Sequence, residues 1–117
     1  MLLGVGREDG EAQAAYLADK VLNLRVFTDE AGRMNLSVLE TGGDVMVVSQ
    51  FTLLADCRKG RRPSFVPAAE PELAEALYED FVRRISLSPL QVETGEFGEL
   101  MTVSLENEGP VTLVIDT

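Results

Sequence analysis

Apolar residues in this chain recur with two spacings, one typical of helices and one typical of strands. Residues 1–5 are mainly apolar and predict a short buried strand. Asp9 or Gly10 can cap a helix that runs to about Asn23, because the apolar residues after it recur at helical intervals. The apolar face of this helix is formed by Leu17, Val21 and Leu24.

A second helix is predicted to begin at Pro71, because proline is favoured in the first turn of a helix. Pro89 ends the region that follows. The apolar stripe of this helix is formed by Leu73, Leu77, Phe81 and Ile85, with Tyr78 and Val82 beside it. These aromatic residues are most simply interpreted as core residues.

The remaining apolar segments have strand-like patterns. Residues 25–28 and 34–39 are expected to be extended around a turn at residues 29–32. Residues 45–54 carry the strongest strand signal, because the four apolar residues at the start of this segment indicate burial on both faces. Residues 101–116 alternate between apolar and polar side chains around a Gly-Pro turn, which predicts a terminal hairpin.

Extended segments outnumber helices, and no linker or repeat divides the chain. The pattern predicts a single α+β domain over residues 1–117. Its core is expected to be a mainly antiparallel β-sheet, barrel-like or sandwich-like, with two helices covering part of it. Such a sheet leaves exposed edges, and a second copy of the chain would cover them. A homodimer is therefore expected.

Composition excludes several kinds of chemistry. The chain has no histidine and a single cysteine, Cys57, which excludes Ser-His and Cys-His catalytic pairs and an internal disulfide. The same scarcity argues against a zinc site, so no metal or cofactor is expected. No apolar run reaches the roughly 20 residues that span a bilayer, and residues 1–5 lack the features of a signal sequence. A cytoplasmic protein with no membrane partner is expected.

The charge distribution is acidic with one local exception. The net charge of −10 argues against broad, non-specific nucleic-acid binding, and no DNA partner is expected. This net charge does not exclude a protein that binds only the end of an RNA. Arg58–Arg62 places four cations in five residues. This cluster is either a solvated loop that offsets the acidic surface or a phosphate-contacting patch beside a site.

Two short strings carry most of the functional information: Ser49–Thr52, at the end of an apolar run, and Asn107–Thr112, in a turn near the C-terminus. Together with the sequence between them, they resemble the D-aminoacyl-tRNA deacylase family. The similarity runs from about Leu2 to Ile115. Further matching segments are Leu3–Val5, Phe27–Asp29, Met34–Leu36, Val48–Leu53, Arg62–Phe65 and Ala74–Tyr78. Members of that family begin with a β-hairpin before the Leu-Gly-Val strand, so this chain is expected to be short at its N-terminus.

The resemblance implies a substrate, the 3′ end of a tRNA that carries a D-amino acid, and products, free tRNA and the free amino acid. The scissile ester is activated by a neighbouring ribose hydroxyl and an α-ammonium group, so it requires positioning and oxyanion stabilisation more than a strong nucleophile. Thr52 is either the attacking group or a hydrogen-bond donor to the substrate. The second role is favoured, because the chain offers no histidine base.

The resemblance also implies substrate-binding residues. Phe51 either stacks on the terminal adenine or packs in the core. The other residues assigned to substrate binding are Ser49, Gln50, Met34 and Asn35.

Gly109 and Pro110 are the chirality-selecting element that the resemblance implies. A cis Gly-Pro turn can present backbone atoms that collide with an L side chain and accept a D side chain or glycine. In the family this turn reaches into the active site of the partner subunit, so a homodimer completes both sites. Two other functions stay open: an inactive tRNA-binding or dimerisation paralogue, and an editing deacylase of the same fold with relaxed chirality.

Overall fold

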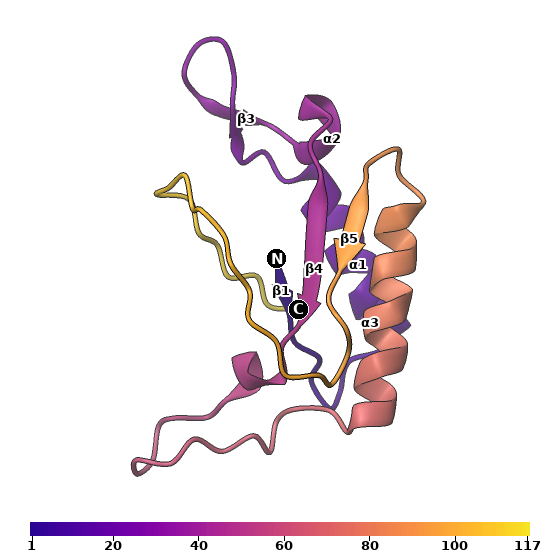
Figure 1. Cartoon of the computed structure of the whole chain (residues 1–117), viewed down its shortest axis with the longest axis vertical. Helices are drawn as coiled ribbons and strands as arrows, with labels where there is room; N and C mark the ends of the chain where they lie inside the picture. The colour runs from indigo at the N-terminus through magenta and orange to yellow at the C-terminus, as the bar shows by residue number, and fades with distance from the viewer.

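The computed structural model describes residues 1–117 as a small sheet with two long helices packed on one face (Figure 1). The sheet has three strands in the order β1-β4-β5, and a separate two-stranded ribbon joins β2 and β3. The strands are β1 (Leu2–Leu3), β2 (Phe27–Thr28), β3 (Met34–Leu36), β4 (Val45–Ser49) and β5 (Val92–Thr94). The helices are α1 (Glu11–Asn23), α2 (Val38–Thr41), the 3₁₀ helix η1 (Phe51–Leu54) and α3 (Pro71–Ser86).

Both long helices form where the sequence predicted them. Gly10 is the N-cap of α1, and its N–H donates to the Gln13 side chain (3.1 Å), which satisfies one backbone donor of the first turn. Pro71 is the first residue of α3, as expected. Ala14 and Ala18 are buried in α1, and these small side chains allow α1 and α3 to pack against each other.

The core lies between the sheet and these two helices. Its three most deeply buried large side chains are Phe81, Ile85 and Val47. The Tyr78 hydroxyl donates to the Val47 carbonyl oxygen (3.0 Å) and so ties α3 to the central strand. Burial raises the pKa of the Tyr78 hydroxyl, which stays protonated and able to donate this bond.

The α+β class is confirmed, but the prediction of a mainly antiparallel, barrel-like or sandwich-like sheet is wrong. β1 pairs with β4 in parallel, with Leu2 opposite Val48, and β4 pairs with β5 in parallel, with Val45 opposite Val92. Parallel neighbours need a crossover connection, and α1 and α3 each lie in one. Both crossovers move in the same direction across the sheet, which places both helices on one face. Only the β2–β3 ribbon is an antiparallel strand pair.

The predicted extended segment 34–39 is wrong at its end, because Ser37 starts the short helix α2. The Ser37 side chain accepts from the Glu40 N–H (3.2 Å), and the Glu40 carboxylate accepts from the Ser37 N–H (2.7 Å). This reciprocal pair of hydrogen bonds is a capping box, and it starts α2 directly after β3 ends at Leu36. The backbone hydrogen bond from Ser37 lowers the pKa of Glu40.

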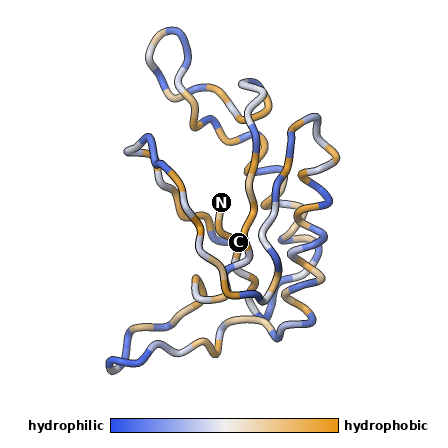
Figure 2. Tube along the Cα trace, viewed as in Figure 1, coloured by the Kyte–Doolittle hydropathy of each residue, from blue (hydrophilic) through white to orange (hydrophobic).

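Two other strand predictions need correction. The strand predicted over 45–54 ends at Ser49 and continues as the helix η1. The paired strands of the hairpin predicted at 101–116 do not form, because that segment contains no strand. It runs as an extended arm that turns back on itself (Figure 1). Figure 2 shows hydrophobic residues along this arm, and most of them are exposed. No helix of the chain has the length and apolar character needed to cross a membrane.

Candidate functional site

A cavity of about 900 Å³ opens where β1 and β4 end, beside η1 and the first turn of α3. Residues 97–101 and Val103, at and just before the start of the C-terminal arm, complete its wall. The whole segment Ser49–Thr52 lines the cavity, so four of the sequence-predicted site residues lie together. Other lining residues include Val48, Phe65, Ala68, Tyr78 and Met101. A cavity of this size holds a small organic ligand.

The hydroxyl of Thr52 has one defined partner. β4 ends at Ser49, and the chain then tightens into η1, which brings Gln50 beside Thr52. The Gln50 side-chain amide donates to Thr52 Oγ1 (2.7 Å). An amide nitrogen that donates cannot accept a proton, so Gln50 orients Thr52 and does not serve as its base. The hydroxyl hydrogen of Thr52 remains available to a ligand.

Phe51 is not a core residue. Its side chain is 57% exposed and lines the cavity. Its ring meets the ring of Phe65 edge to face, with centroids 5.1 Å apart. Phe65 therefore holds one side of the Phe51 ring, while the exposed part of the Phe51 ring is open to a planar ligand.

The remaining predicted site residues lie outside the cavity. Met34 and Asn35 belong to β3 and are exposed, and the Asn35 side chain accepts from Arg25 (3.4 Å). Gly109 and Pro110 form an exposed turn in the C-terminal arm, joined by a cis peptide bond. Figure 1 shows this arm turning back at a point well away from η1. The single chain therefore does not bring the turn to its own Thr52.

Three charged residues that sequence reasoning missed also line the cavity. They are Arg7, Glu70 and Glu99. Arg7 follows β1 and is held by its own N–H, which donates to the Pro67 carbonyl (3.1 Å). Glu70 is the N-cap of α3, a position that the sequence marks by the proline after it. Nothing in the local sequence shows that these residues face one cavity, because they come from three distant segments.

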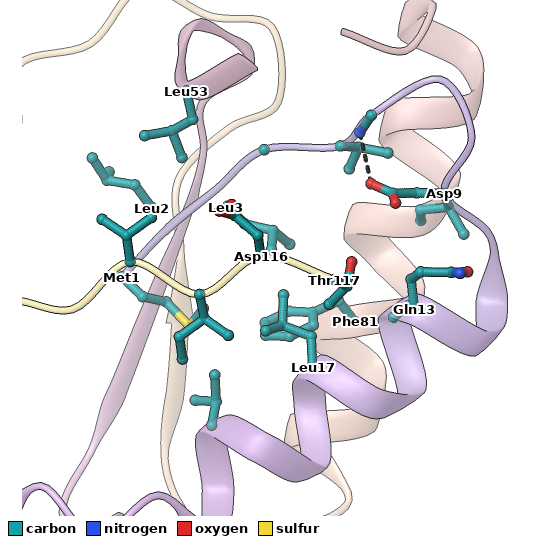
Figure 3. A pocket seen from close by; sticks show the side chains of 18 of the residues that line it. Met1, Leu2, Leu3, Asp9, Gln13, Leu17, Leu53, Phe81, Asp116 and Thr117 are labelled. Carbon is teal, nitrogen blue, oxygen red and sulfur yellow. Dashed lines mark hydrogen bonds between the residues drawn. The ribbon is translucent and has the colours of Figure 1, made fainter. Parts of the chain in front are cut away.

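A second cavity of about 620 Å³ lies between β1, α1 and the last residues of the chain (Figure 3). Its wall is mainly apolar, with Leu3, Leu17 and Phe81 among its residues. The Asp9 carboxylate at its edge already accepts from the Gly6 N–H (2.7 Å), the bond drawn as a dashed line in Figure 3. The larger cavity, which holds the hydroxyl and amide groups of residues 49–52, is the better candidate for chemistry.

An exposed ion pair lies just after η1. The Asp56 carboxylate receives two hydrogen bonds from the Arg58 guanidinium (2.7 and 2.8 Å), which holds the pKa of Asp56 far below its usual range. No group of three or more histidine, cysteine, aspartate or glutamate side chains is arranged to hold a metal ion. Cys57 is exposed and unpaired.

Sequence comparison decides the family, because the profile described as D-Tyr-tRNA(Tyr) deacylase matches residues 1–116. This chain belongs to that family. A protein of Desulfatibacillum aliphaticivorans named D-aminoacyl-tRNA deacylase is 58% identical over 117 residues, all of this chain and 80% of the relative. The deacylases of Thermosipho africanus and Desulforudis audaxviator are 56% and 59% identical over all of this chain and 78% of each relative. The family resemblance in the sequence is confirmed.

Solved structures support the same fold for this deacylase family member. The c-Myc DNA Unwinding Element Binding Protein matches with a TM-score of 0.86 and 37% identity, over 94% of this chain and 75% of that one. A probable eukaryotic D-amino acid tRNA deacylase matches with a TM-score of 0.73 over 92% of this chain and 77% of that one. The identity to this second protein is 19%, so that similarity concerns the fold alone.

Proposed function

We propose that this chain hydrolyses the ester bond between a D-amino acid and the 3′-terminal adenosine of tRNA in the cytoplasm. The family and the names of its relatives support the reaction class. The observation that carries the proposal is the cavity lined by Ser49–Thr52, because it gathers a hydroxyl, an amide and an exposed aromatic ring at one opening. These groups suit a substrate with a carbonyl, a sugar and a base.

The proposed chemistry relies on positioning. Thr52, held by Gln50, donates its hydroxyl hydrogen to the carbonyl oxygen on which negative charge develops. Water, assisted by the neighbouring ribose hydroxyl, attacks the carbonyl carbon, the acyl–oxygen bond breaks, and the ribose oxygen takes up a proton. The substrate's α-ammonium group is attracted by the carboxylates of Glu70 and Glu99 in the cavity wall. No protein nucleophile is needed.

The exposed ring of Phe51 is proposed to stack on the terminal adenine. Its neighbour Phe65 packs against it edge to face and limits its movement. A ring that is already held loses little conformational freedom when a base stacks on it. Stacking on an aromatic side chain is a common way for proteins to hold an unpaired RNA base. Ser49 adds a further polar group at the same opening.

The reaction is tested with matched D- and L-aminoacyl-tRNA and with glycyl-tRNA. We expect release of the D-amino acid and of glycine and retention of the L-amino acid. Equal release of D- and L-amino acids would support the editing deacylase with relaxed chirality. Release of neither, with the protein folded, would support the inactive tRNA-binding paralogue.

We further propose that Gly109 and Pro110 select chirality in the site of a second subunit. Both residues are exposed and lie outside their own chain's cavity. The arm that carries them also exposes apolar side chains, including Leu105 and Val114, which are 74% and 87% exposed. A second copy would cover this apolar surface and place the turn where it can meet substrate. Met34 and Asn35, which are also exposed, are proposed to contact substrate in the same assembly.

Mixing two defective variants tests this arrangement. Thr52→Ala removes the hydroxyl, and the double variant Gly109→Ala/Pro110→Ala alters the turn. Each is expected to be defective alone, in rate and in D/L discrimination respectively. Mixed dimers contain one site with an intact Thr52 and an intact turn, so selective D-deacylation should return after the two are unfolded and refolded together. Light scattering at micromolar concentration checks the dimer. A monomer, or mixing without recovery, would contradict the shared site.

A further inference from the structure

The loop between η1 and α3 concentrates positive charge. Arg58, Lys59, Arg61 and Arg62 are four of the ten lysine and arginine residues in a chain with a net charge of −10. All four are exposed. Figure 2 shows this hydrophilic tip at the far end of a loop that projects from the body of the molecule. The cations are therefore gathered at one point of an otherwise acidic protein.

The loop has a defined base. The Asp56 N–H donates to the Ser64 carbonyl (2.7 Å), and the Ser64 N–H donates to the Asp56 carbonyl (3.0 Å). Gly60 has a φ of +72° in the turn between these two residues, a conformation that glycine adopts without strain. The loop therefore closes on itself as a short antiparallel pair and holds its tip away from the sheet and helices (Figure 1).

Only one of the four cations is neutralised within the protein. Arg58 is paired with Asp56 at the base of the loop (2.7 Å). The chain's other ion pairs join Asp80 to Arg83 and Arg84, so Lys59, Arg61 and Arg62 have no carboxylate partner. No contact within the protein therefore neutralises these three cations. They are exposed to solvent, where an external anion can reach them.

The base of the loop adjoins the larger cavity. The loop follows η1, which carries Thr52, and it returns through Phe65, whose ring contacts Phe51 at a centroid distance of 5.1 Å. Thr52, Phe51 and Phe65 all line the cavity. A ligand that enters the cavity and continues outward on this side would therefore pass the cationic tip.

We propose that Lys59, Arg61 and Arg62 bind the phosphates of the RNA strand that leads to the 3′-terminal adenosine. This inference rests on the proposed function, which places that adenosine beside Phe51. Phosphate contacts of this kind position a nucleic acid without reading its sequence. A compact cationic tip captures the strand near its end, while the acidic remainder of the surface repels the rest of the RNA. The cationic tip therefore affects the binding of tRNA, whereas the chemical step takes place in the cavity.

The test compares two substrates and two triple variants. The loop variant is Lys59→Gln/Arg61→Gln/Arg62→Gln. The control is Lys20→Gln/Arg83→Gln/Arg84→Gln, which removes the same charge from α1 and α3. We expect the loop variant to lose about tenfold in kcat/KM for D-aminoacyl-tRNA and nothing for a D-aminoacyl-adenosine ester, which has no phosphate. The slope of log(kcat/KM) against log[salt] should also become shallower, by about 0.7 for each phosphate that the variant no longer neutralises.

The control variant should keep the parent's rate and salt dependence. Equal losses in the two variants, or an unchanged salt slope in the loop variant, would overturn the phosphate contact. Affinity for uncharged tRNA, measured with the same proteins, gives a readout that does not depend on hydrolysis. If the parent hydrolyses neither ester, the proposed reaction fails, and the loop is judged on this affinity alone. Weaker tRNA binding by the loop variant only would then support the inference, and equal binding would overturn it.

Discussion

Thr52→Ala is expected to lower the rate of D-aminoacyl-tRNA hydrolysis by about 100-fold, the loss typical of removing one donor from an oxyanion site. The variant loses the hydroxyl that is proposed to donate to the carbonyl oxygen of the substrate, a hydroxyl that Gln50 orients without acting as a base. The loss should appear in kcat, because the donated hydrogen bond strengthens as charge develops on the carbonyl oxygen. Rapid quenching and mass spectrometry of the parent should find no amino acid esterified to Thr52.

Thr52→Ser is the matched control for this prediction. Serine keeps the hydroxyl that accepts from Gln50, so most of the activity should return. An acyl-enzyme ester isolated on Thr52 would show that the hydroxyl is the nucleophile and would contradict the positioning role. A Thr52→Ala variant with full activity would remove Thr52 from the mechanism altogether.

Phe81→Ala is expected to lower the free energy of unfolding by about 3–5 kcal/mol, the range for truncating a buried phenylalanine. Phe81 is 1% exposed and lies at the centre of the core, where α3 meets the sheet and α1. Alanine would leave a cavity that the surrounding helices cannot close without moving. Urea unfolding followed by circular dichroism measures the change, through the midpoint at a constant slope.

Leu87→Ala is the control for the core prediction. Leu87 directly follows α3 and is 78% exposed, so its side chain packs against little of the protein. Its effect should stay within about 0.5 kcal/mol, as for most surface substitutions. Similar losses from Phe81→Ala and Leu87→Ala would mean that the core is not organised around α3.

The two long helices were predictable because their signals are local. Gly10 before α1 and Pro71 at the start of α3 set the helix starts, and side chains three and four residues apart form each apolar face. The start of α2 was equally local, because Ser37 and Glu40 have the spacing of a capping box. It was missed because alternation in the preceding residues favoured a longer strand.

Strand partners were not predictable from alternation. Residues 101–116 alternate as strands do, yet they form no strand. A segment becomes a strand only when a neighbouring segment satisfies its backbone groups, and alternation does not show which segment that is. The parallel direction of β1, β4 and β5 follows from the two helical crossovers. That information was present in the order of the elements, but the abundance of extended segments favoured an antiparallel interpretation.

The candidate site divides in the same way. Ser49–Thr52 were found from the sequence because they are contiguous, and contiguous residues at a strand end must lie together. The cationic loop was also visible in the sequence, because its four cations lie within five residues, and the composition showed that the chain has no histidine to act as a base. Only the tertiary structure brought Arg7, Glu70 and Glu99 to the cavity and left Gly109 and Pro110 outside it. Local propensity decides what a segment becomes, whereas packing of distant segments decides which side chains share a site.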